Sequence, residues 1–268
     1  MPENIDQLTV SGFGEEWSTF DQAALPEKER KALFDAYFAV FPFDSLPADA
    51  EGFDLGCGSG RWAALMVGRV GTLHCIDPSE KALEVAQRNV AGARFHLADA
   101  ENIPLADESQ DFGYSLGVLH HVPDTQKALI ACVRKLKPGA PFLVYLYYAF
   151  DNRPAWYRLV WKTSDMIRKC ICRLPFGLKK ALTGVIAVTV YWPLSRASRY
   201  AGHDFPLYAY RNSSFYTLRT DALDRFGTPL EQRFTKEQVR KMMEKAGLTR
   251  IRFCDAIPYW TAVGFKAL

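Results

Sequence analysis

The sequence predicts an α/β fold in which a mostly parallel sheet is covered by helices on both faces. Strand-like and helix-like segments alternate at short intervals from residue 52 to residue 148, which is typical of βαβ units with right-handed crossovers. A glycine-rich turn follows the first of these strands, and the α/β pattern returns between residues 235 and 266. A chain of 268 residues is long enough for one large domain with a self-sufficient core.

The strands are predicted from short apolar runs bounded by turn-forming residues. A buried strand at 52–55 leads into the glycine turn, and further strands are expected at 72–76, 93–97, 112–118 and 142–148. The run at 142–148 is almost wholly apolar, as expected for a strand at the centre of a sheet that is covered on both faces. Two final strands are expected at 248–254 and 259–266.

The helices are predicted from apolar residues that recur at helical spacing behind a capping residue. In chain order they are expected at 27–41, 61–69, 79–90, 124–136, 155–172, 178–192 and 235–246. Ser79 and Asp124 are suitable N-caps, and Thr235 with Gln238 forms a capping box.

The segment 149–216 interrupts the α/β pattern. It contains two of the expected helices and an aromatic polar loop, with thirteen Phe, Trp and Tyr residues. Its eleven Lys and Arg and three Asp and Glu give the segment a net charge of +8. Because the whole chain has a net charge of +3, the remainder has −5. We therefore predict an N-terminal helical lead-in or lid at 1–49, an α/β core at 50–148 and 217–268, and a helical, aromatic and basic insert at 149–216.

Composition argues against several classes of protein. Lys and Arg number 33 against 30 Asp and Glu, a balance that argues against a dedicated nucleic-acid-binding protein. The six cysteines form no CxxC pair, so no metal is expected. The N-terminus does not resemble a signal peptide, and the longest apolar run, at 183–194, is shorter than the about 20 residues of a membrane span. A cytoplasmic location is therefore expected.

The segment FDLGCGSG at 53–60 is the most informative part of the chain. Its G-x-G-x-G turn lies between a strand and a helix, where glycines allow close approach to the backbone and a helix N-terminus offers free N–H groups. Asp77 ends the next strand, where a carboxylate can accept both ribose hydroxyls of a nucleoside. Folds that bind dinucleotides have the glycine spacing G-x-G-x-x-G instead. The Asp54 carboxylate, two residues before the first glycine, would also suit a cation better than a pyrophosphate. The pattern indicates a nucleoside-bearing cofactor, and a purely structural glycine turn is the alternative.

The chain also resembles a known family through the segments FDLGCGSGRW, CIDPS and LADAENIPLADESQDFGYSLGVLHHVPD. These resemble the class I S-adenosylmethionine-dependent methyltransferases, in particular the small-molecule branch with the type-11 methyltransferase domain. The resemblance covers residues 50–148 and 235–266 and implies a Rossmann-like, seven-stranded sheet of order 3-2-1-4-5-7-6 with one antiparallel edge hairpin. It also implies S-adenosyl-L-methionine as the methyl donor, S-adenosyl-L-homocysteine as the product, and an acceptor site beneath the insert at 149–216.

The same resemblance implies that twelve residues bind the cofactor. They are Asp54, Gly56, Cys57, Gly58 and Gly60 around the glycine turn, Asp77 and Pro78 after the second strand, Asp99 and Ala100 after the third, Ser115 and Leu116 at the end of the fourth, and Trp17 near the N-terminus. Asp54 would lie near the methionine amino group, Asp77 would bind the ribose hydroxyls, and Asp99 with the Ala100 backbone would bind the adenine. Trp17 would shield the sulfonium or, alternatively, anchor the first helix.

His120 and His121 follow the fourth strand, beside the expected methyl donor. Either histidine could take a proton from an acceptor hydroxyl or amine, and the alternative is that the HHVPD turn uses them for capping and packing. The carboxylate that the family often carries at the end of the fifth strand is absent here, because Tyr147 and Tyr148 occupy that point, although Asp151 could substitute.

Acceptor specificity is expected to lie in and around the insert. The residues expected to contact the acceptor are Tyr147, Tyr148, Arg153, Tyr208, Tyr210, Tyr216 and Arg219. The positive charge of the insert suggests an acceptor that is anionic or lipid-like. The apolar run at 183–194 lies between basic residues and could rest on an anionic membrane surface, and a buried cap helix is the simpler alternative.

The sequence thus predicts a methyltransferase that acts on an oxygen or nitrogen atom of a small molecule, with carbon as a further option. No nucleic-acid partner is expected, because amino-group methyltransferases of nucleic acids resemble [N/D]PP[Y/F] where this chain has SLGV. Two alternatives from other classes stay open. One is a non-catalytic protein that binds S-adenosylmethionine, and the other is a nicotinamide-dependent oxidoreductase, which would favour the longer glycine spacing.

Overall fold

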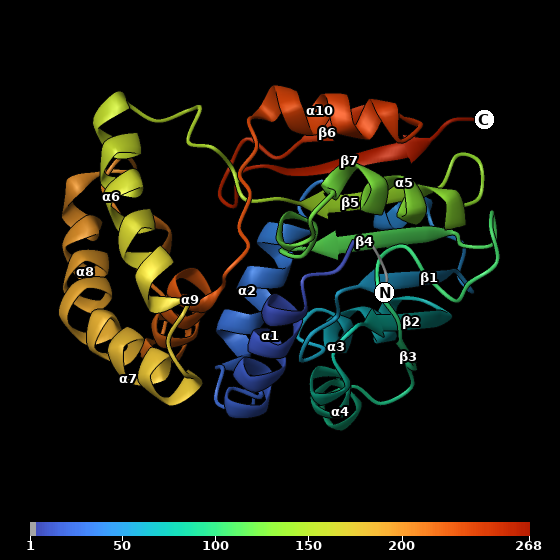
Figure 1. The fold of residues 1–268 in the computed structure, drawn as a ribbon. Coiled ribbons are helices and arrows are strands. Elements are labelled where there is room, and N and C mark those ends of the chain that lie inside the picture. Colours follow the sequence, from blue (N-terminus) through green and yellow to red (C-terminus); the bar gives the residue numbers. More distant parts are fainter. Residues whose placement is uncertain (1–3) are drawn as a thin grey trace.

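The computed structural model describes residues 4–268, in which seven strands form a single sheet (Figure 1). The strands are β1 Glu51–Leu55, β2 Thr72–Asp77, β3 Arg94–Leu97, β4 Phe112–Leu116, β5 Pro141–Tyr145, β6 Leu248–Phe253 and β7 Thr261–Lys266. Their order is β3-β2-β1-β4-β5-β7-β6, and β7 runs antiparallel between β5 and β6 while the other neighbours are parallel. The predicted fold class and strand order are confirmed.

Helices surround this sheet and also form a separate layer beyond it. The α-helices of the described chain are α1 Gln7–Thr19, α2 Glu27–Tyr37, α3 Ala63–Met66, α4 Glu80–Asn89, α5 Thr125–Lys135, α6 Ala155–Ile171, α7 Phe176–Ile186, α8 Trp192–Ala201, α9 Phe215–Gly227 and α10 Lys236–Lys245. Figure 1 shows α6 to α9 away from the sheet, with α1 and α2 in between. Consistent with this view, α1 contacts both α4 and α9.

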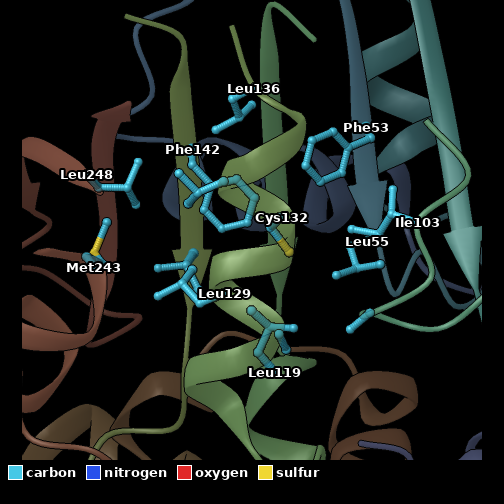
Figure 2. Packing of buried hydrophobic residues seen from close by; sticks show 14 of the residues in the cluster. Phe53, Leu55, Ile103, Leu119, Leu129, Cys132, Leu136, Phe142, Met243 and Leu248 are labelled. Carbon is cyan, nitrogen blue, oxygen red and sulfur yellow. The ribbon is translucent and has the colours of Figure 1, made fainter. Parts of the chain in front are cut away.

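Two hydrophobic clusters hold the helices against the two faces of the sheet. On one face, α5 and α10 pack on β1 and β5; Figure 2 shows Leu129 and Cys132 of α5 close to Phe142 of β5. On the other face, α2, α3 and α4 pack on β2 and β4 through residues such as Phe38 and Tyr114. Because both faces are covered, β4 is buried along its whole length.

The expected caps form as the sequence indicates. The Ser79 side chain accepts a hydrogen bond from the amide of Ala82, and Asp124 accepts one from Lys127. Thr235 and Gln238 make both bonds of a capping box at the start of α10. These local signals fix where the helices begin, and thereby where the loops at the carboxyl ends of the strands lie.

Three predicted helices differ from the structure. The helix expected at 61–69 is reduced to the single turn α3 and a 3₁₀ turn at Val67–Arg69, where Gly68 lowers helix propensity. The helix expected at 27–41 ends at Tyr37. The helix expected at 178–192 begins at Phe176 and continues through a π-helical segment at Ala187–Tyr191 into α8, because Pro193 lies in the first turn of α8, where a proline is tolerated.

The helix α9 was not expected at all. Ser214 caps it by accepting a hydrogen bond from the amide of Thr217, and its buried residues include Leu218, Ala222 and Phe226. The predicted boundary at 216/217 therefore falls inside this helix, which joins the layer of α6 and α7 to the rest of the molecule.

Candidate active site

A cavity of about 1570 Å³ lies at the carboxyl ends of β1, β2, β4 and β5 and beneath α1, α2, α6 and α9. Among the residues expected to bind cofactor or acceptor, those that line it are Trp17, Gly56, Cys57, Gly58, Asp77, Pro78, Leu116, His121, Tyr147, Tyr148, Arg153, Tyr208 and Tyr210. The chain thus brings most of the predicted site residues, from six separate segments, around one space.

The glycine loop after β1 has a backbone that only glycine adopts easily. Gly56 and Gly58 have φ angles of +75° and +53°, and a side-chain carbon at Gly56 would lie 2.3 Å from Val118. A side-chain carbon at Gly58 would lie 2.9 Å from the indole nitrogen of Trp17. The loop therefore presents bare backbone to the cavity, with Trp17 directly opposite.

The helix α1 spans the cavity from this loop to the histidine turn. Phe13 stacks on Trp17 with ring centroids 6.4 Å apart, and its ring lies 5.0 Å from that of His121. Asp6 caps the helix by accepting a hydrogen bond from the amide of Thr9. The N-terminal segment is thus part of the cavity wall.

Asp77 ends β2 with its carboxylate against the glycine loop. Its oxygens accept hydrogen bonds of 2.9 Å from the amides of Gly58 and Ser79. Burial raises the pKa of Asp77 to about 6, and these two N–H donors oppose the shift. The carboxylate therefore holds the loop and is ionised at neutral pH.

Asp54 lies buried at the end of β1, with 1% of its surface exposed. Neither carboxylate oxygen has a hydrogen-bond partner within the described residues. Burial raises the pKa of Asp54 to about 8, while the Tyr114 hydroxyl lowers it and the Asp77 charge raises it. A buried carboxyl group without a partner can accept a hydrogen bond from a donor on a bound ligand.

His121 lies in a 3₁₀ turn after β4 and lines the cavity. Its Nδ1 lies 2.6 Å from the carbonyl oxygen of Leu230. Because a carbonyl can only accept, Nδ1 carries the proton and Nε2 has the free lone pair. Nε2 has no partner among the residues that the structure describes. Burial lowers the pKa of His121, although the Asp224 charge and the Leu230 carbonyl oppose the shift, so the ring is neutral at pH 7.

His120 has a different environment, although it is the adjacent residue. It is fully buried and does not line the cavity. Its ring stacks on that of Tyr147 with centroids 3.8 Å apart, and burial lowers its pKa well below the usual range. The geometry therefore gives His120 a packing position and places His121 at the cavity.

Sequence reasoning missed an acidic wall opposite the glycine loop, formed by Glu16, Asp221 and Asp224, all of which line the cavity. The Tyr147 hydroxyl donates a 2.7 Å hydrogen bond to Asp224. Glu16 is 4% exposed with Oε1 unpartnered in residues 4–268, and burial and the charges of Asp224 and Asp221 raise its pKa well above its usual range. Burial raises the pKa of Asp221 to about 6, with Arg61 opposing. The one sequence signal was the helical spacing of Asp221 and Asp224, in a part of the predicted core to which no helix was assigned.

Eight predicted residues do not line the cavity: Asp54, Gly60, Asp99, Ala100, Ser115, His120, Tyr216 and Arg219. Asp99 accepts hydrogen bonds from the side chain and amide of Asn102, and Ser115 donates one to the Leu55 carbonyl. Tyr216 accepts one from the amide of Gln22, and Arg219 lies over the ring of Phe20, 4.5 Å from its centroid. Because they hold the loop after α1, Tyr216 and Arg219 are placed as supports of the N-terminal segment.

The described residues contain neither a metal site nor a membrane-spanning helix. No group of three or more His, Cys, Asp and Glu side chains in residues 4–268 could hold a metal ion. In the same range, no helix has both the length and the apolar character that crossing a membrane requires.

The strand order, the glycine loop after β1 and the carboxylate at the end of β2 define the fold of the class I S-adenosylmethionine-dependent methyltransferases. Residues 53–144 match the family of the methyltransferase domain. The chain thus has the fold of the class I S-adenosylmethionine-dependent methyltransferases, and residues 53–144 within it are similar to their methyltransferase domain.

Curated relatives are similar over the core of the chain. A ubiquinone biosynthesis O-methyltransferase of Thiobacillus denitrificans is 35% identical over 38% of this chain and 44% of the relative. A demethylmenaquinone methyltransferase of Desulfitobacterium hafniense is 33% identical over 48% of this chain and 54% of the relative. The chain spans about half or less of the length of the relatives it matches.

A solved structure supports the fold over nearly the whole chain. A methyltransferase of Thermotoga maritima, described as a possible histamine N-methyltransferase, superposes with a TM-score of 0.54, covering 97% of this chain and all of that protein. Since the two share 17% sequence identity, the likeness concerns the fold alone.

Proposed function

We propose that this chain transfers the methyl group of S-adenosyl-L-methionine to an oxygen or nitrogen atom of a small molecule, with S-adenosyl-L-homocysteine as the second product. The observation that carries the proposal is the free Nε2 lone pair of His121, which lies in the same cavity as the glycine loop. The relatives named above, by their printed names an O-methyltransferase and a demethylmenaquinone methyltransferase, support a small acceptor.

The residues present fit S-adenosylmethionine. At Gly56 and Gly58 a side-chain carbon would collide with Val118 or Trp17, so the loop presents bare backbone to the cavity, and Asp77 ends β2 beside it. The face of Trp17 suits a sulfonium. The orphaned Asp54 carboxyl group is buried behind the cavity wall and would suit an ammonium group that reached it through the glycine loop. When bound, the cofactor supplies a methyl group on a positively charged sulfur, which is electrophilic without further activation.

The chain's own task is then to position the acceptor, exclude water and remove a proton. His121 is held in the tautomer that accepts a proton at Nε2, because the Leu230 carbonyl fixes Nδ1–H. Once His121 is protonated, the nearby charge of Asp224, which raises its pKa, stabilises the imidazolium. The arrangement resembles a histidine base with a carboxylate behind it, although the carboxylate comes from α9 and not from the end of β5.

The acceptor faces a wall that mainly accepts hydrogen bonds. Glu16, Asp221 and Asp224 carry carboxyl groups, and Tyr147 and Tyr210 add phenols. Groups of this kind bind hydroxyl, amine or ammonium groups. This part of the wall favours an acceptor with hydrogen-bond donors, while Arg153, Arg211 and Arg233 line the same cavity and suit an acidic group of the acceptor.

The test is formation of S-adenosylhomocysteine with panels of polyhydroxylated and amine acceptors, compared with His121→Asn. Asn keeps a donor for the Leu230 carbonyl but has no lone pair at the position of Nε2. The proposal would be supported if the native chain forms S-adenosylhomocysteine with an acceptor and the His121→Asn variant does not. A chain that binds S-adenosylmethionine by calorimetry but never releases homocysteine product would instead be a non-catalytic binding protein, and binding of NADH alone would point to an oxidoreductase.

A further inference from the structure

The helices α6, α7 and α8 expose large apolar side chains to an unusual extent. Of the seventeen that are well exposed in residues 4–268, twelve lie between Trp156 and Tyr200. These twelve are Trp156, Leu159, Val160, Met166, Ile167, Leu178, Leu182, Val185, Val188, Val190, Trp192 and Tyr200. We call them the outer apolar surface, because in Figure 1 these helices form the layer farthest from the sheet.

The helix α6 is amphipathic, with its apolar side facing outward. Met166 and Leu159 are 70% and 65% exposed, whereas the buried residues Asp165 and Arg168 face inward and bind each other at 2.7 Å. A surface helix of a water-soluble protein normally has the opposite arrangement. Exposed apolar side chains in this number on one helix indicate an interaction site.

The helix α7 and the π-helical segment that follows repeat this arrangement. Thr183 and Ala187 are buried on the side that packs on α9, while Leu178 and Val185 are 55% and 58% exposed. Both helices thus present large apolar residues to the outside, in addition to Ile171 and Tyr191, which pack in the cluster around α9.

The charges around this surface have a single sign. Residues 155–201 contain nine Lys and Arg and one acidic residue, Asp165. That aspartate is buried and paired with Arg168 and with Lys169, which lies 3.0 Å from it. The exposed cations of the segment are Arg158, Lys162, Lys169, Arg173, Lys180 and Arg199.

We infer that the outer apolar surface docks on an anionic lipid membrane, with α6 and α7–α8 lying in its interfacial region. Apolar side chains would enter the acyl boundary, and the surrounding Lys and Arg would meet acidic headgroups. Charge complementarity favours this occupant over a second copy of the chain, because two copies face to face would oppose two sets of cations without a carboxylate between them.

The cavity borders the same surface. Val160 and Val190 both line the cavity, and they are 51% and 41% exposed. If the proposed methyl transfer is correct, an amphiphilic acceptor could pass from the membrane into the cavity at this border. Membrane docking itself does not depend on that activity.

The experiment is flotation of the purified full chain with vesicles of phosphatidylcholine, alone or mixed with phosphatidylglycerol. We expect the chain to float with the mixed vesicles and to be released by added salt. Lys162→Ala should lower the partition coefficient about fivefold, as expected for one cation near an anionic surface. Flotation needs no acceptor, so failure of the methyl-transfer proposal would leave its result unchanged.

The chain offers a matched pair of apolar substitutions. Ile167 on α6 is 49% exposed and Ile130 on α5 is 45% exposed. Ile167→Glu should lower vesicle binding at least about tenfold, since it removes an inserted side chain and adds a negative charge, and Ile130→Glu should leave it unchanged. Equal loss in both variants, or no flotation with either kind of vesicle, would overturn the inference. So would a dimer in vesicle-free solution that Ile167→Glu alone converts to monomer.

Discussion

Replacing Asp54 by Asn should stabilise the protein while it weakens cofactor binding. The Asp54 carboxyl is buried without a hydrogen-bond partner in the described chain, and its pKa is raised to about 8. The native state therefore keeps a proton that the unfolded state, with a pKa near 3.8, releases. Because the pKa of Asp54 is higher in the native state than in the unfolded state, its contribution to the free energy of unfolding is fully present below pH 3.8. This contribution is lost as the pH rises to about 8.

The size of the effect follows from the same two pKa values. Between 3.8 and neutral pH lie about three units, each worth about 1.4 kcal/mol, so keeping the Asp54 proton that the unfolded chain releases costs the native state about 4 kcal/mol at pH 7. Asn has the same shape and no charge, and its oxygen can accept a hydrogen bond from Tyr114. The variant Asp54→Asn should therefore have the same free energy of unfolding as the wild type near pH 4. Above that pH the variant should be the more stable protein, by a difference that grows up to about pH 8.

The assay is urea unfolding of both proteins without ligand, followed by circular dichroism across this pH range. Asp107→Asn is the control with the opposite sign, because hydrogen bonding from Lys135 lowers the pKa of Asp107. That variant should be less stable than the wild type at neutral pH. In the same preparations, Asp54→Asn should bind S-adenosylmethionine about 10- to 100-fold more weakly, because Asn cannot release a proton and form a charged hydrogen bond with the ammonium group of the ligand. A stability difference that does not grow with pH would refute the reasoning.

Three other predictions concern the cavity. His121→Asn should lower kcat by at least about 100-fold with little change in KM, measured as formation of S-adenosylhomocysteine; an unchanged kcat would exclude His121 as the base. The affinity for S-adenosylmethionine should fall as the pH drops below about 6, where Asp77 gains a proton, and calorimetry showing constant affinity down to pH 5 would contradict this. Gly58→Ala should weaken cofactor binding at least about tenfold, because its φ is positive and Trp17 is close. Gly92→Ala, with a positive φ and open space around it, should lose similar stability and bind normally.

The parts of the fold that could be predicted are those fixed by local patterns. The strand, glycine loop and Asp77 lie within residues 51–77, and each depends on neighbours in the sequence. The α9 helix was missed although it carries local signals of the same kind: Ser214 is an N-cap, and Leu218, Ala222 and Phe226 recur at helical spacing. The polar, aromatic stretch before it obscured this pattern, and only the packing against α7 shows which face is buried.

The two histidines show the same limit within the site. His120 and His121 are adjacent, and both are buried. Only the 3₁₀ turn, the ring of Tyr147 and the Leu230 carbonyl distinguish them, and Leu230 lies 109 residues away along the chain. The acidic wall is even harder to predict from the sequence. Glu16 and Asp224 come from opposite ends of the chain, and only the fold brings them to the same cavity.

The charge of the insert shows why net charge alone does not identify an acceptor. The sum of +8 for residues 149–216 suggested an anionic molecule. In the structure, Arg168 and Arg196 bind backbone carbonyl groups, and the exposed cations surround the outer apolar surface. The cavity side of the neighbouring helix α9 instead carries Asp221 and Asp224. The cations of the insert are therefore divided: six are exposed around the outer apolar surface, while Arg153 and Arg211 line the cavity beside these carboxyl groups. An anionic surface on one face and a polar acceptor on the other would account for both sets.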